Sequence, residues 1–352
     1  DAGLRGSFHT GSVGHQWAAN VTHYQHTQND YGRRSVPGWD WTTNLYNPVW
    51  GPAAPFVAPH ISHTELTLDS IGVADTLAFA DDHVQLTLGV RRQQVVSETF
   101  NVSTGARTSR YDESATTPAA ALLVKATDTI ALYTNYIEGL SQGATAPMTA
   151  ANAGDVFAPF RTRQKELGLK LDLGSFAHTF SMYEIKRPSS YTDPVTNIFS
   201  FGGEQRNRGV EWGFFGAPLD GVRLLGGVAY VRPKLTRTAG GVNEGRIATA
   251  VAQRQAKLGV EWDVPTLQGL TLTGNATAMS KQYISADNSL SVPGRTLFDV
   301  GARYSTTVEG RPLALRASVN NVTNKAYWGM PLLSSLALGA PRTVLLSATM
   351  DF

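Results

Sequence analysis

One stretch of this sequence, between Asn29 and Ser62, combines many aromatic rings with Arg33 and Arg34. A loop in water gains little from large rings unless they pack on one another or hold a ligand. The rings provide rigid contact area, and phenol, indole and guanidinium groups donate hydrogen bonds to ligand oxygens. A self-packed cluster of rings remains the alternative. We predict ligand contacts from five rings of this stretch: Tyr31, Trp39, Trp41, Tyr46 and Trp50.

Four more aromatic residues are weaker candidates for the same ligand site. Phe157 and Phe160 lie close to another long polar connection, and Tyr327 and Trp328 follow a segment of alternating polarity. The same chemistry applies to them, because their rings could contact the apolar part of a bulky ligand. Four tyrosines are weaker candidates as well, and for them anchoring at the membrane interface is the stronger interpretation: Tyr133, Tyr136, Tyr191 and Tyr283.

Catalytic and metal-binding patterns are not evident. His23 and His26, like His60 and His63, are three residues apart, which places each pair on opposite faces of an extended strand. His178 does not form a recognisable dyad with Ser181. We therefore predict no catalytic residue, no protein-bound metal and no cofactor, and we do not expect an enzyme.

The composition narrows the possible classes of protein. The charged residues are nearly balanced, with 30 basic and 28 acidic side chains spread along the chain, so no basic stripe suggests nucleic acid. There is no run of 18 apolar residues, which excludes a membrane helix. The chain has no cysteine, so disulfides and thiolate metal sites are excluded. It begins at Asp1 without a signal peptide, so we expect a processed chain or a fragment.

Alternating polarity dominates the chain and predicts β-strands throughout. Leu313 to Asn320 and Thr343 to Phe352 alternate apolar and polar residues, and the chain ends on an aromatic residue. Period two places successive side chains on opposite faces of a strand. Fifteen strands are predicted and no helix, over these ranges: 2–10, 15–28, 63–80, 84–98, 116–126, 129–138, 161–173, 176–188, 205–216, 222–236, 248–264, 270–283, 295–307, 313–322 and 342–352.

The predicted connections alternate between short and long. Short turns such as 11–14 and 174–175 follow every odd strand, whereas long segments such as 29–62 and 139–160 follow every even one. Up-and-down membrane barrels have short periplasmic turns and long outer loops. A mean hydropathy of −0.17 is compatible with this class, because only alternate residues would face lipid. A soluble sandwich with one wet face is the alternative.

The strands also indicate which side faces lipid. Gly-apolar-charged triplets recur, for example at Gly168-Leu169-Lys170 and Gly209-Val210-Glu211. We expect Leu167, Leu169 and Leu171 to face lipid while Glu166, Lys170 and Asp172 face a polar lumen. Trp212, Phe214 and Trp262 stand shortly before short turns, where an aromatic girdle is expected.

Several segments resemble TonB-dependent ferric-siderophore receptors, especially the ferrichrome and hydroxamate-type group. The resemblance covers nearly the whole chain. Its most specific segments are Val292-Pro-Gly-Arg-Thr-Leu-Phe-Asp-Val-Gly-Ala-Arg-Tyr304, Val319-Asn-Asn-Val-Thr-Asn-Lys-Ala-Tyr-Trp328 and Pro341 to Phe352. It implies an all-β, transmembrane, antiparallel up-and-down β-barrel of about 22 strands with a plugged lumen. Residues 1–352 would supply about the last fifteen strands, and the plug, the TonB box and the first strands would precede Asp1.

The resemblance also implies a function. A receptor of this group would lie in the bacterial outer membrane, bind a ferric siderophore at its extracellular loops and import it with energy from TonB. The iron would arrive as chelated Fe³⁺ within the cargo. Expected partners are the siderophore, TonB through the plug, and outer-membrane lipid and lipopolysaccharide. A passive porin-like channel is the runner-up, and a barrel enzyme and a soluble all-β binding module are further alternatives.

Overall fold

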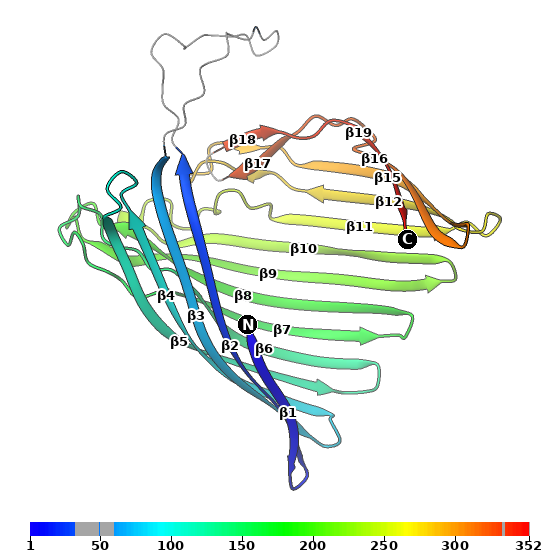
Figure 1. Ribbon diagram of the computed structural model, residues 1–352, viewed down its shortest axis with the longest axis horizontal. Coiled ribbons are helices and arrows are strands. Elements are labelled where there is room, and N and C mark those ends of the chain that lie inside the picture. The colour runs from blue at the N-terminus through cyan, green and yellow to red at the C-terminus, as the bar shows by residue number, and fades with distance from the viewer. Residues whose placement is uncertain (32–48, 50–59, 333–334, 352) are drawn as a thin grey trace.

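The computed structural model describes residues 1–31, 49, 60–332 and 335–351. Fifteen of its strands form one antiparallel sheet in the order β1-β2-β3-β4-β5-β6-β7-β8-β9-β10-β11-β12-β15-β16-β19. Figure 1 shows this sheet as a curved wall, with neighbouring strands side by side. The sheet strands are β1 (Ala2–Thr10), β2 (Val13–Tyr31), β3 (His60–Phe79), β4 (Val84–Phe100), β5 (Arg107–Lys125), β6 (Ile130–Ser141), β7 (Phe160–Asp172), β8 (Phe176–Thr192), β9 (Phe199–Leu219), β10 (Val222–Arg237), β11 (Arg254–Asp263), β12 (Leu270–Met279), β15 (Arg295–Val308), β16 (Arg311–Asn320) and β19 (Thr343–Met350).

The remaining elements lie in the long connections. Two short hairpins, β13 with β14 and β17 with β18, and one 3₁₀ turn were not expected from the sequence. No helix of the described residues is long and apolar enough to cross a membrane. The bounds of these elements are β13 (Gln282–Tyr283), β14 (Ser291–Val292), β17 (Trp328–Leu332), β18 (Ser335–Leu338) and η1 (Ala239–Gly241).

All fifteen predicted strands correspond to strands of the main sheet, but the predicted lengths need correction. β5 begins at Arg107 and β9 at Phe199, so both strands run into segments predicted as loops. The connections β4–β5 and β8–β9 are therefore no longer than the turn from Val264 to Gly269, and connection length alone does not separate the two ends. We call the ends of the sheet the loop end, where β6–β7, β10–β11 and β16–β19 connect, and the turn end opposite.

Strand register confirms the division between the two faces. Leu132 pairs with Leu169, Leu169 with Phe180, Phe180 with Trp212, and Trp212 with Val228. Registered partners share a face, so these five apolar side chains form one row across β6 to β10. We call the surface that carries this row the apolar face, and the surface that carries Glu166 and Lys170 the polar face.

The apolar face has the height expected for contact with lipid. On β10, this face carries only apolar residues, glycine and one tyrosine from Val222 to Tyr230. Nine strand residues extend about 30 Å, and a tilt of about 40° leaves a band about 23 Å tall. Near the turn end, His178 stacks with Trp212 at 6.1 Å between ring centroids, and Trp212 lies 5.0 Å from Phe214. The predicted girdle residues Trp212 and Phe214 thus pack together on the apolar face.

Glycines of the polar face allow two tyrosine rings to lie against the wall. A Cβ atom added at Gly168 would lie 2.3 Å from the Tyr133 ring, and one at Gly209 would lie 2.6 Å from the Tyr183 ring. Each tyrosine is registered opposite its glycine on the neighbouring strand. Only a residue without a side chain fits beneath such a ring, which explains the glycine in both triplets. The interpretation of Tyr133 as a lipid-interface anchor is therefore wrong, because its ring belongs to the polar face.

Candidate binding site at the loop end

The candidate site is the group of connections at the loop end, which carries the aromatic residues predicted to contact a ligand. Among these, Phe157 and Phe160 belong to one cluster. The Phe160 ring stacks on Phe201 at 4.0 Å between centroids, and Phe157 lies 4.9 Å from Phe201 and 5.6 Å from Phe199. The cluster closes over the buried residues Ala146 and Ala150. Phe157 and Phe160 thus pack mainly against protein.

An asparagine joins the two loops that meet at this cluster. The Asn152 side chain donates a hydrogen bond to the Phe199 carbonyl (3.0 Å) and accepts one from the Phe199 amide (2.8 Å). Asn197 donates in the opposite direction, to the carbonyl of Thr149 (2.9 Å). These bonds satisfy backbone groups that would otherwise need water, so the β6–β7 and β8–β9 loops form one packed unit.

The acidic residue at the start of the β8–β9 loop stabilises its turn. The Asp193 carboxylate accepts hydrogen bonds from the backbone amides of Thr196 (2.8 Å) and Val195 (2.9 Å). These bonds favour the charged carboxylate, so they lower the pKa of Asp193 below its ordinary value.

A second pair of loops is joined in the same way. Asn288, in the β12–β15 connection, accepts a hydrogen bond from the Ile247 amide and donates one to the Ile247 carbonyl, each at 2.8 Å. The neighbouring Asp287 carboxylate bonds to Ser285 and to the amide of Ser289, and these bonds lower its pKa to about 2. The β10–β11 and β12–β15 loops are thus also fixed relative to each other by a side-chain amide.

Tyr327 and Trp328 lie at a different part of the loop end, on the β16–β19 connection. The Arg295 guanidinium lies 4.8 Å from the centre of the Tyr327 ring, and its Nη1 donates to the Trp328 carbonyl (3.2 Å). The Trp328 residue is 40% exposed. The Tyr327 ring also lies directly over Gly339. Of the four described candidate rings, Trp328 therefore keeps the most freedom to contact a ligand.

The predicted residues of the first aromatic stretch cannot be compared in the same way. Tyr31 is the last residue of β2 and pairs with His60. Trp39, Trp41, Tyr46 and Trp50 lie outside the described residues. Their role in binding stays a prediction.

The polar face below the loops carries two groups of polar and charged side chains whose mutual contacts the sequence did not predict. The Tyr133 hydroxyl donates to Glu166 (2.6 Å), with Lys170 5.4 Å from the ring centre. Nearer the turn end, Arg223 binds two carboxylates, Asp263 (2.6 Å) and Glu261 (3.0 Å). Strand register brings these residues together from neighbouring strands, and no sequence spacing announces it. Such a wall offers hydrogen-bond donors and acceptors to a polar cargo or to an inserted domain.

The candidate residues for catalysis do not come together. His178 lies on the apolar face, where the Trp212 indole donates a hydrogen bond to its Nδ1 (3.3 Å), while Ser181 is registered opposite Gly168 on the polar face. In the described part of the chain, no group of three or more His, Asp or Glu could hold a metal ion.

A curved antiparallel sheet with a lipid-compatible outer band and a polar inner wall defines part of a membrane β-barrel. Residues 2–322 match the family described as TonB dependent receptor-like, beta-barrel. The chain is 36% identical over 366 residues to the ferrichrome receptor FcuA of Yersinia enterocolitica, covering 99% of this chain and 47% of FcuA. It is 26% identical to the metal-pseudopaline receptor CntO of Pseudomonas aeruginosa, with 99% of this chain and 50% of CntO covered.

Solved structures agree with these sequence relatives. The crystal structure of BauA, the ferric preacinetobactin receptor from Acinetobacter baumannii, superposes with a TM-score of 0.91 at 56% identity, covering 99% of this chain and 53% of that chain. The chain belongs to the TonB-dependent receptor β-barrel family, which consists of outer-membrane transport receptors of Gram-negative bacteria. It spans about half the length of the curated relatives it matches.

Proposed function

We propose that this chain forms the wall and part of the extracellular mouth of a receptor that imports a ferric siderophore with TonB-derived energy. The observation that supports this most is the pair of relatives named as siderophore receptors, at 36% and 56% identity over 99% of the chain. Binding and gated passage would be its chemistry, with no covalent step and no resident cofactor. The Fe³⁺ ion would belong to the cargo.

The loop end suggests how the cargo is held. Phe157 and Phe160 would support the loops from within, because their rings pack on Phe199 and Phe201. Trp328 and the aromatic stretch from Tyr31 to Trp50 would supply the contacting rings, since rigid aromatic groups suit a bulky chelate. A hydroxamate-type siderophore remains the predicted cargo class.

The polar face suggests where the remaining partners act. A plug inside the barrel would face the ionic groups of Tyr133–Glu166 and Arg223–Asp263, and TonB would act through that plug. A passive porin is the less favoured function, because the relatives are receptors and not porins.

Uptake of labelled iron tests the proposal. The complete gene product would be expressed in a strain that lacks its own siderophore receptors, and uptake of ⁵⁵Fe from preacinetobactin, ferrichrome and ferric citrate would be compared. We expect saturable uptake of at least one chelate, abolished when TonB is deleted. Uptake that persists without TonB and does not saturate would indicate a porin, and no uptake of any ferric chelate would refute the cargo.

A further inference from the structure

Asp75 places a carboxylate on the apolar face, well inside the part of this face that contacts lipid. It is registered opposite Leu88 of β4, and its neighbours on the same face of β3 are Leu77 and Val73. β3 ends four residues beyond Asp75, at Phe79, so the carboxylate lies about 10 Å from the turn end of a band about 25 Å tall. Asp75 is therefore near the middle of the membrane and not at its boundary.

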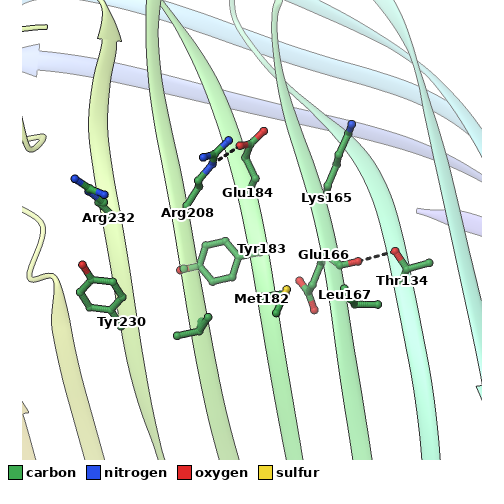
Figure 2. Close-up of a pocket in the computed structure, with 12 residues that line it drawn as sticks. Thr134, Lys165, Glu166, Leu167, Met182, Tyr183, Glu184, Arg208, Tyr230 and Arg232 are labelled. Carbon is green, nitrogen blue, oxygen red and sulfur yellow. Dashed lines mark hydrogen bonds and ion pairs between the residues drawn. The ribbon is translucent and has the colours of Figure 1, made fainter. Parts of the chain in front are cut away.

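Charged side chains elsewhere on this face lie further from the turn end. In Figure 2, Leu167 and Met182 belong to the apolar part of the face, and Lys165 begins its charged part nearer the loops. Lys165 lies seven residues before the end of β7, and Arg92 lies eight residues after the start of β4. A charge only four residues from the turn end is thus a local property of β3.

Within the described residues, the Asp75 carboxylate has one hydrogen-bond partner. His15 Nδ1 donates to Asp75 Oδ2 at 2.7 Å, and the His15 ring stacks on Phe8 of β1 at 4.4 Å between centroids. Asp75 Oδ1 is buried and accepts no hydrogen bond from the described part of the chain. Trp17 is registered opposite Asp75, but its ring lies over Gly6, on the other side of β2. Since a carboxylate can accept about four hydrogen bonds, this one is poorly satisfied.

Lipid alone is an unfavourable surrounding for this pair. Ionisable groups at membrane depth are costly, and they normally face protein or water and mark functional positions. The Asp75 side chain is 35% exposed and the His15 side chain 14% exposed, so both remain accessible to an adjacent molecule. A molecule that covers this surface should therefore offer polar groups at the depth of Asp75.

A second copy of the chain meets this requirement by symmetry. Two copies with the same orientation in one membrane are related by a two-fold axis along the membrane normal, so each residue meets the other copy at its own depth. The His15–Asp75 pair is also self-complementary, because it combines a donor ring with an acceptor carboxylate. Two copies would bring each His15 opposite the partner's Asp75.

We propose that the apolar face of β2 to β4 around His15 and Asp75 is an interface between two copies of this chain. His15, as an imidazolium, donates through Nδ1 to its own Asp75 and through Nε2 to the partner's Asp75, so two rings and two carboxylates form a closed, neutral group. Leu88 and Val73, which are 48% and 50% exposed, supply apolar contacts around it. The proposal rests on the placement of the chain in a membrane and not on its cargo, so failure of siderophore uptake would not affect it.

Photocrosslinking tests which molecule covers this surface. Benzoyl-phenylalanine would replace Leu88 in the complete receptor, in outer membranes, and the control would carry it at Leu258, a 44% exposed residue of the same face on β11. Two copies with different affinity tags would be expressed together. We expect the Leu88 position to give a product of twice the receptor mass that contains both tags, and the Leu258 position to give none. Equal yields at the two positions, no product at Leu88, or a product with a different protein instead would each overturn the proposal.

Substitution of the carboxylate tests the role of the polar pair. Asp75→Leu would be compared with Asp69→Leu, which removes a carboxylate that binds His23 at 2.6 Å on the same face, six residues nearer the loops. A polar contact within a membrane is worth roughly a factor of three to twenty in association, and the two-fold axis doubles the loss, so Asp75→Leu should lower the crosslinked yield on the order of tenfold or more. We expect Asp69→Leu to lower it by less than about threefold.

Both variants must keep the gel shift of an unheated barrel. If Asp75→Leu loses that shift, Asp75→Asn replaces it, because an amide keeps the shape of the side chain but removes the charge that pairs with the imidazolium. An unchanged crosslinked yield after substitution of Asp75 would overturn the proposal, as would equal losses in the Asp75 and Asp69 variants.

Discussion

A charge placed in the middle of the apolar face should test whether this face of the sheet contacts lipid. The assignment of the chain to a membrane β-barrel depends on that orientation. Leu258 is the natural position, because β11 carries Arg254 four residues toward the loop end and Trp262 four residues toward the turn end. Its registered neighbours are Gly226 and Ala276, and Leu258 itself is 44% exposed on this face. The substitution Leu258→Arg would place a guanidinium near the bilayer centre.

The expected loss of unfolding free energy follows from the depth of Leu258 in the bilayer. An arginine facing lipid at mid-bilayer destabilises a barrel by about 2–4 kcal/mol. The matched control is Ala229→Arg on the polar face, where the registered partners are Glu211 and Gln255. A guanidinium there stays out of the lipid and lies opposite the Glu211 carboxylate, so we expect a change below about 1 kcal/mol.

The measurement is the free energy of unfolding of the complete receptor in lipid vesicles, from guanidinium titration followed by tryptophan fluorescence. We expect the Leu258→Arg protein to unfold at clearly lower denaturant than the Ala229→Arg protein. Equal stabilities, or a larger loss for Ala229→Arg, would show that the two faces have been assigned the wrong way round.

Three further outcomes are expected. Gly168→Ala should cost about 1–3 kcal/mol of unfolding free energy, because the new Cβ meets the Tyr133 ring, whereas Gly139→Ala has open space and should change it by less than about 0.5 kcal/mol. Asn288→Ala should speed amide exchange at Ile247 by roughly tenfold or more, since two hydrogen bonds worth about 1 kcal/mol each are lost; unchanged exchange would contradict the loop pairing. The Ser289 amide should be protected from hydrogen exchange at neutral pH and lose this protection as the pH falls from about 4 toward 2. The reason is that the folded pKa of Asp287 lies below its unfolded value, and protonation of the carboxylate removes the hydrogen-bond acceptor. Asp287→Asn should abolish this pH dependence.

The strands were predictable because their two faces meet different solvents. Leu313 to Asn320 alternates without interruption, and β16 has those bounds to within two residues. The loop-end half of β5, from Arg107 to Thr116, lacks that alternation because nearly all of its side chains are polar, and only Tyr111 and Ala115 among them are buried. Hydrogen bonds to β4 and ion pairs such as Arg110–Glu98 maintain it instead, and those depend on a partner strand that single-sequence periodicity does not contain.

The candidate site was predictable only in part, for a related reason. An aromatic residue in a polar loop indicates either ligand binding or packing against other residues. Phe157 packs, because its ring contacts Phe199 and Phe201, which lie more than forty residues away along the chain. Arg223 and Asp263 likewise meet through the register of β10 and β11. The residue types show which side chains could bind a ligand, but the arrangement of the strands determines which residues those side chains contact.

The Gly-apolar-charged triplets show how one short pattern serves two purposes. At Gly168 and Gly209, the central residue maintains the lipid-facing row, while the glycine accepts a tyrosine ring from the preceding strand. The ring covers backbone on the polar face and directs its hydroxyl toward the carboxylates there, as Tyr133 does toward Glu166. Since a barrel wall is only one residue thick, it has no interior core to hold polar side chains in fixed positions. Flat contacts between rings and glycines supply that rigidity, so the ionic groups that face the lumen are held in place before any cargo or inserted domain meets them.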